Sequence, residues 1–395
     1  MNLEHKIELL APASRFDACD TFGQGGKRFA QKKAVWGDDA VVSESGSDGR
    51  AMPVFRVLMS SQCAWDCPYC PLRSGNDTPR ATLSPKELSA AVLPRAAKGT
   101  IRGVLLSTGV DGTPAAATQQ TLDGVEQLRR DGYDGYVHVK LPAGAPLSDV
   151  TRAATLADRL SINLEAPSAA HLAALSPARR WHEDLIAPLV HARDLRRADP
   201  QAFRAGLATQ FVVGAAGESD RDLLLTTAWL LRDIGLARVY YGAFRPAPGT
   251  PRAGELPTPY VRERRLREAD WLLRQYHFLH DELPYDAAGD LPLGQDPKLA
   301  WALAHPERFP VEINTAAPEA LLRVPGLGPL GVRRLLRLRR DATFREPEQL
   351  RVLGSAALRA ADFLAFNGRF FGPTPDVVRR RYTARAPVAE QLTLW

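Results

Sequence analysis

The feature that most constrains the fold is an alternation of short β-branched runs with longer alanine- and leucine-rich stretches, which extends from Val54 to Phe244. This alternation is typical of βα units that build a parallel sheet. Periodicity alone fits either a partial (β/α)6 barrel or a doubly wound sheet. The strands are expected at Val54–Met59, Gly103–Ser107, Tyr136–Leu141, Leu160–Leu164, Thr209–Val213 and Arg238–Phe244, with helical patterns near 84–97, 116–131, 148–158, 168–196 and 218–235.

The length of 395 residues indicates two or three domains, or one large barrel with appendages. Apolar residues at 45% and charged residues at 24% exclude wholesale disorder. No run of about 18 apolar residues occurs, and the first residues lack an apolar signal segment, so we expect a cytoplasmic protein without a membrane partner. The predicted parts are an irregular lead-in (1–50, with a Gly/Ser-rich loop at 37–50), a barrel (51–255), a helical connector (256–309), a compact helical domain (310–372) and a basic tail (373–395).

Three of the four cysteines, Cys63, Cys67 and Cys70, follow the first predicted strand with CxxxCxxC spacing. Three thiolates on one short loop can converge on a single centre, and soft ligands favour an iron–sulfur cluster or zinc. Zinc normally takes a fourth protein ligand, and no Cys or His partner lies nearby in sequence. A [4Fe–4S] cluster held by three cysteines would leave one iron open. Structural zinc and an accidental grouping are the alternatives.

With an aromatic residue before the last cysteine, the loop resembles the CxxxCxΦC hallmark of the radical S-adenosylmethionine (SAM) superfamily. The resemblance implies a partial (β/α)6 TIM-type barrel, a [4Fe–4S] cluster, SAM, a reducing electron donor and chemistry through a 5′-deoxyadenosyl radical. It also implies cofactor contacts near the strand ends, although the acidic residue usual in the turn after the second strand is absent here. The expected cofactor-binding residues are Tyr69, Ser107, Thr108, Gly109, Asn163 and Glu165.

Polar residues at the carboxyl ends of barrel strands face an active site by geometry. Lys140 ends the third predicted strand and Glu165 follows the fourth, so both are candidate catalytic residues. Each could instead be a solvated strand end. Gln210 could point inward from the middle of its strand. Cys19 is a third catalytic candidate, although a lone cysteine is more often an inert packed residue.

The C-terminal region predicts two helices joined by a tight Pro325–Gly328 turn, and a second, degenerate hairpin at Leu350–Ser355. Residues 321–351 contain eight arginines and three acidic residues, a local charge of +5. The pattern resembles the helix-hairpin-helix motif of DNA repair and recombination proteins, in which glycines let backbone N–H groups approach a phosphate. A hairpin used only for packing is the alternative. The expected DNA-binding residues are Gly326, Gly328, Gly331, Arg333, Arg334 and Arg337.

Together, the cysteine motif and the basic hairpins resemble a family described as DNA modification or repair radical SAM proteins. The resemblance is supported by four further segments, Phe16–Cys19, Ser74–Asp77, Asn163–Pro167 and Phe244–Pro251. It implies an enzyme that repairs or modifies DNA through backbone contacts without sequence preference. An RNA-modifying radical SAM enzyme and a non-catalytic, DNA-bound iron–sulfur sensor or scaffold are the alternatives.

Overall fold

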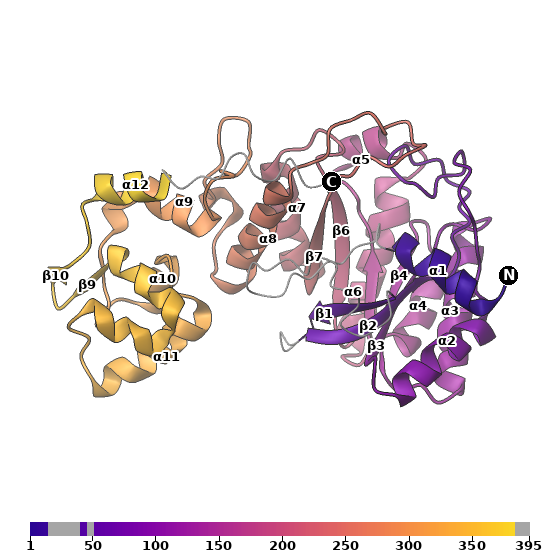
Figure 1. Cartoon of the computed structure of the whole chain (residues 1–395), viewed down its shortest axis with the longest axis horizontal. Helices are drawn as coiled ribbons and strands as arrows, with labels where there is room; N and C mark the ends of the chain where they lie inside the picture. The colour runs from indigo at the N-terminus through magenta and orange to yellow at the C-terminus, as the bar shows by residue number, and fades with distance from the viewer. Residues whose placement is uncertain (15–39, 46–50, 384–395) are drawn as a thin grey trace. The chain divides into compact units, whose positions relative to one another are not determined.

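The computed structural model describes residues 1–14, 40–45 and 51–383 (Figure 1). The chain divides into two compact units. Unit 1 contains Met1–Glu218 and Trp229–Thr258, and unit 2 contains Ser219–Ala228 and Pro259–Trp395. Within the described ranges, no helix has both the length and the apolar character needed to cross a bilayer.

Unit 1 is built on a seven-stranded sheet whose strands are neighbours in the order in which they occur in the chain. Strands β2 to β7 are parallel, and β1 pairs antiparallel with β2. A doubly wound sheet reverses its strand order at a switch point, so the unbroken order excludes that alternative and gives a curled half-barrel. The strands are β1 Val41–Ser45, β2 Ala51–Leu58, β3 Gly103–Ser107, β4 Tyr136–Leu141, β5 Arg159–Ile162, β6 Leu207–Val213 and β7 Arg238–Ala243.

Helices connect the parallel strands, as the sequence predicts. Figure 1 shows α2, α3 and α4 on one side of β1 to β4. Ser84 caps α2 in a capping box with Glu87. Two predicted helical stretches are interrupted by π-helical turns at Trp181–Ile186 and Leu230–Ile234. The helices are α2 Pro85–Ala97, α3 Pro114–Arg130, α4 Leu147–Leu156, α5 Ala169–Leu175, α6 Ala187–Ala198 and α7 Asp220–Trp229.

The two faces of the sheet differ in chemistry because successive side chains on a strand point to opposite sides. One face is apolar and fully buried. Phe55 belongs to it, and Arg95 of α2 lies over its ring at 5.0 Å from the centroid. The opposite face carries buried polar groups. Among them, Lys140 Nζ of β4 donates to Gln210 Oε1 of β6 at 2.8 Å. The interior face of the half-barrel therefore combines these polar groups with a small apolar cluster of Val54, Leu105, Ala208 and Tyr240. Gln210 points inward, as the sequence allowed.

The prediction of an irregular lead-in is wrong for the parts of residues 1–50 that the structure describes. Helix α1 spans Leu3–Ala13, and Asn2 Oδ1 caps it by accepting the His5 N–H at 2.9 Å. Strand β1 falls within the predicted loop at 37–50 and is fixed by long-range contacts. Its Glu44 is 2% exposed, and Oε1 lies 3.6 Å from His138 Nδ1 of β4. Cys19 lies outside the described residues.

Unit 2 is mostly helical, with α8 Tyr260–Gln275, α9 Pro297–Ala304, α10 Pro318–Arg323, α11 Pro329–Asp341 and α12 Pro375–Thr383. The expectation of an all-α C-terminal domain is wrong, because a three-stranded sheet is present. Its strands are β8 Val311–Glu312, β9 Leu364–Phe366 and β10 Arg369–Phe370. Strands β9 and β10 form a hairpin around Asn367 and Gly368, whose φ angles of 53° and 75° suit a type I′ turn.

Candidate functional site

The three clustered cysteines lie on the loop between β2 and α2, at the carboxyl edge of the parallel sheet. Cys67 is buried, while Cys63 and Cys70 are half-buried, and all three are free thiols. The Cys70 N–H donates to the Cys67 carbonyl oxygen at 3.0 Å, which closes a turn between these two residues. Ligands bind at this edge of parallel α/β sheets, so the loop occupies the place where a site is expected.

A single arginine organises this cysteine loop. The guanidinium of Arg80 donates to the carbonyl oxygens of Ser61 at 2.5 Å, Leu72 at 2.8 Å, Arg73 at 2.8 Å and Asn76 at 3.2 Å. These four acceptors lie on both sides of the cysteines in sequence. The Arg80 side chain therefore ties the two ends of the cysteine loop together through the backbone carbonyl groups of the loop.

A second contact within the loop comes from Asp66. Its carboxylate accepts hydrogen bonds from Arg73 at 2.5 Å and from the Gly75 N–H at 3.2 Å. Although desolvation acts to raise it, the pKa of Asp66 is held below its usual value by the Gly75 and Arg73 hydrogen bonds. The Ser74–Asp77 segment therefore orders the loop.

The turn after β3 packs tightly against the cysteine loop. A Cβ atom on Gly109 would lie 2.2 Å from the Gln62 carbonyl oxygen, so no other residue fits here. The Gly109 N–H donates to the Ser60 oxygen at 2.8 Å, and the Thr108 hydroxyl donates to the Gly109 oxygen at 2.8 Å. Ser107 is 1% exposed, and its hydroxyl has no hydrogen-bond partner among the described residues. Of these three expected cofactor-binding residues, Ser107 has an unused polar atom.

Glu165 follows β5 and is one of the candidate site residues predicted from strand ends. Arg179 connects it to the cysteine loop. Arg179 donates to Glu165 Oε1 at 3.2 Å and to Cys67 Sγ at 3.5 Å. Its guanidinium also lies over the Trp65 ring, 4.6 Å from the centroid. Glu165 has a φ of 63°, and non-glycine residues in this left-handed region concentrate at functional sites.

Sequence reasoning missed two residues of this site, Arg179 and Ser176. The Ser176 hydroxyl lies 3.2 Å from Cys67 Sγ. Both residues follow α5 in a turn that matches no motif, so only the fold brings them to the cysteines. Asn163 is half-buried just after β5, whereas Lys140 is buried within β4.

The surroundings of the cysteine loop disfavour an uncompensated thiolate at Cys70. Burial raises the pKa of the Cys70 thiol to about 12, so a thiolate there needs positive charge nearby. Burial and the neighbouring Glu165 carboxylate raise the pKa of the Tyr69 hydroxyl. In the described part of the chain, no three His, Cys, Asp or Glu side chains are grouped closely enough to hold one metal ion. The three thiols of the cysteine loop are therefore not converged on one point in this structure, and this holds for zinc and for an iron–sulfur cluster alike.

The predicted hairpin in unit 2 joins α10 to α11. Gly326 has a φ of 89° and packs against the 3₁₀ segment Ser355–Phe363, where a Cβ would lie 3.0 Å from the Ala356 oxygen. The second predicted hairpin turns at Gly354, with a φ of 115°, between two 3₁₀ helices, Pro347–Leu353 and Ser355–Phe363. Each predicted glycine turn therefore connects two helical segments.

Four arginines of α11, the hairpin arginines, are exposed, and none has a hydrogen-bond or ion-pair partner among the described residues. They are Arg333, Arg334, Arg337 and Arg340. Arg339 on the same helix differs, since it donates to the Ile313 and Ala316 carbonyl oxygens at 3.2 and 2.8 Å. A Cβ on Gly331 would meet nothing within 4 Å, whereas one on Gly328, the N-cap residue of α11, would lie 3.2 Å from the Tyr276 hydroxyl oxygen. The first turn of α11 is therefore open at Gly331 and packed at Gly328.

No family model matches the sequence. Among solved structures, methylornithine synthase (PylB) is similar with a TM-score of 0.45 and 14% identity, over 56% of this chain and 61% of PylB. The chain thus spans about three fifths of that structure. HydG, a maturase of the [FeFe]-hydrogenase, gives a TM-score of 0.44 and 12% identity, over 84% of this chain and 81% of HydG. HydG from Carboxydothermus hydrogenoformans gives 0.42 and 13%, with the same coverage. At these scores, the similarities do not assign an activity to this chain.

Proposed function

We propose that this chain is a radical SAM enzyme that acts on nucleic acid, with DNA as its substrate. The observation that carries the proposal is the cysteine loop at the carboxyl edge of an unbroken parallel sheet, where Arg179 contacts both Cys67 and Glu165. Three thiolates on one loop suit a [4Fe–4S] cluster with one open iron. The half-buried Cys70 thiol with its raised pKa, the cationic Arg179 and the unpartnered Ser107 hydroxyl are consistent with such a group and a polar cofactor.

In this proposal, Cys63, Cys67 and Cys70 hold the cluster. A cluster held there and reduced would supply the single electron that reductive cleavage of SAM requires. We assign Arg179, which pairs with Glu165 in the structure, to the SAM carboxylate, because its planar guanidinium matches that group. We assign Glu165 to the SAM ammonium group as its acceptor.

The remaining candidates divide between holding the loop and facing the cofactor or substrate. Gly109 holds the turn after β3 against the cysteine loop, and Thr108 donates within that turn, so we assign both to positioning. Ser107, Asn163 and Tyr69 are the further residues that we assign to the cofactor, and Lys140 is a candidate for substrate contact on the polar interior face. These assignments separate residues whose loss would move the loop from residues whose loss would weaken cofactor binding.

The nucleic-acid part of the proposal rests on the hairpin arginines. Unpaired, exposed guanidinium groups on one helix suit the phosphate backbone, because such contacts need charge and donors but no base recognition. A base in a duplex would have to leave the stack to meet a radical inside the half-barrel. The proposed reaction is therefore lesion repair or modification of an exposed base or sugar.

The test of catalysis is anaerobic reconstitution with iron and sulfide, reduction, and measurement of 5′-deoxyadenosine released from SAM with and without damaged DNA. We expect release by the wild-type chain and none by C63A/C67A/C70A. In C19A, which alters a cysteine outside the loop, the iron content should be unchanged. If the reduced chain with its cluster bound releases no 5′-deoxyadenosine with any DNA or RNA, the proposed catalytic activity is contradicted. The non-catalytic iron–sulfur sensor or scaffold is then favoured.

The test of the substrate is binding of the full chain to duplex DNA and to structured RNA at several salt concentrations. R333Q/R334Q/R337Q/R340Q should weaken DNA binding, whereas R130Q should not. Arg130 is an exposed arginine in the last turn of α3. Tighter binding to RNA would move the proposed substrate to RNA. Full DNA affinity in the quadruple variant would contradict the role of the hairpin arginines.

A further inference from the structure

A second cationic feature lies in unit 1, at the opposite edge of the sheet from the cysteine loop. A cavity of about 270 Å³ opens between α6 and the π-helical turn Leu230–Ile234. Its lining includes Leu207, the first residue of β6, and Gly235, which precedes β7. Because the cysteine loop follows the carboxyl end of β2, this cavity is separate from the candidate site.

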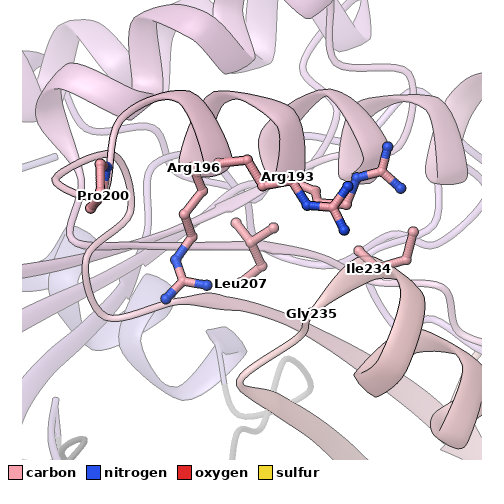
Figure 2. Close-up of a pocket in the computed structure, with 7 residues that line it drawn as sticks. Arg193, Arg196, Pro200, Leu207, Ile234 and Gly235 are labelled. Atoms are coloured by element: carbon pink, nitrogen blue, oxygen red, sulfur yellow. The ribbon is translucent and has the colours of Figure 1, made fainter.

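The cavity has an apolar floor and a basic wall. Leu207 and Ile234 are buried at its floor. The wall consists of three arginines from the last two turns of α6, Arg193, Arg196 and Arg197. Figure 2 shows the side chains of Arg193 and Arg196 leaving the helix on either side of Leu207. None of the residues that line the cavity is acidic.

The three arginines differ in the hydrogen-bond and ion-pair partners that they already have. Arg193 has structural partners, since it pairs with Asp194 at 2.8 Å and donates to the Asp233 carbonyl oxygen at 3.5 Å. Arg196 Nε is buried and has no hydrogen-bond partner among the described residues. Arg197 is exposed. The positive charge of Arg196 and Arg197 is therefore available to a ligand.

We propose that this cavity binds a phosphate group through Arg196 and Arg197. Guanidinium forks match phosphate geometry and form charge-assisted hydrogen bonds with it. The volume argues for a small group, because pockets for whole drug-sized ligands start at about 300 Å³. The phosphate could belong to a nucleic-acid backbone or to a free phosphorylated compound. The proposal stands independently of the iron–sulfur and SAM assignments.

Arginines in the last turn of a helix also stabilise the helix dipole, and this effect alone would need no ligand. Arg130 provides the matched control, because it too is a last-turn arginine and is exposed, but it does not line this cavity. The probes are inorganic phosphate, thymidine 3′,5′-bisphosphate and a single-stranded DNA oligonucleotide. Binding to the full chain is measured by phosphorus NMR line broadening for the first two and by anisotropy for the third, in phosphate-free buffer.

We expect R196Q/R197Q to bind the bisphosphate at least about tenfold more weakly than wild type, as the loss of charged hydrogen bonds implies. R130Q should bind as wild type does. The oligonucleotide is tested with R196Q/R197Q added to R333Q/R334Q/R337Q/R340Q, so that the hairpin arginines do not mask a loss. A loss that extends to the oligonucleotide identifies the backbone as the source, and a loss confined to the small probes identifies a free phosphorylated compound. Equal binding of the small probes by R196Q/R197Q and R130Q, with both variants folded by circular dichroism, would overturn the proposal.

Discussion

The contacts of Arg80 make the order of the cysteine loop testable without any cofactor. In R80M, four loop carbonyl oxygens lose their shared donor. We take about 1 kcal/mol for each bond, below the usual value for a charged donor, because water can replace part of the loss at half-buried carbonyls. The free energy needed to open the cysteine loop should then fall by about 4 kcal/mol. This corresponds to a roughly thousandfold increase in the equilibrium constant for opening.

Hydrogen exchange of the apo chain measures this opening directly. The informative amides are Cys70, which donates to Cys67 at 3.0 Å, and Ser74, which donates to Trp65 at 2.8 Å. Both should exchange much faster in R80M, and iron retained after reconstitution should fall. R130M serves as the control for removal of an arginine charge. If both amides keep their wild-type exchange rates in R80M, Arg80 does not organise the loop.

Three further predictions address the packing and the charge of each unit. G109A should lower the melting temperature and the iron content, because its Cβ would lie 2.2 Å from Gln62 O, whereas G254A, with nothing within 4 Å, should be neutral in both assays. Burial lowers the pKa of Lys298 to about 7, so the unfolded chain binds one more proton between pH 7 and 10. Urea unfolding of unit 2 should therefore show stability rising with pH across that window, by up to about 1.4 kcal/mol per pH unit, and K298M should lack the rise; parallel pH profiles would contradict this. Each hairpin arginine replaced by Gln should reduce the slope of log K against log salt for duplex DNA by about 0.9, and an unchanged slope would exclude its phosphate contact.

The strands of the half-barrel could be predicted because their chemistry is local. The bounds of β3 and β4 match the prediction, since both are short, β-branched and buried along their length. The choice between a barrel and a doubly wound sheet could not be made, because it depends on which strands are neighbours. Strand β1 was missed for a related reason. Only Val41 and Val42 are apolar in it, and the buried position of Glu44 depends on pairing with β2 and on the contact with His138.

The residues of the candidate site also divide into those with a local sequence signal and those that only the fold brings to the site. The cysteines and Glu165 are visible from spacing and from strand ends, whereas Arg179 and Ser176 carry no local signal. Their contacts with Cys67 span 112 and 109 residues. One signal was present but unused, since Asn367-Gly368 between apolar runs is a strong hairpin signal and would have predicted β9 and β10. The helix-hairpin-helix assignment of unit 2 stays a prediction.

The separation between Cys67 and Arg179 has a consequence for how the protein is made. Ribosomes add about 5–20 residues per second, so the 112 residues between them take roughly 6 to 22 seconds to synthesise. During that interval the cysteine loop has left the ribosome before its guanidinium partner has been translated. An assembly factor that delivers iron and sulfide to the nascent chain would meet thiols still accessible from the side that Arg179 later covers.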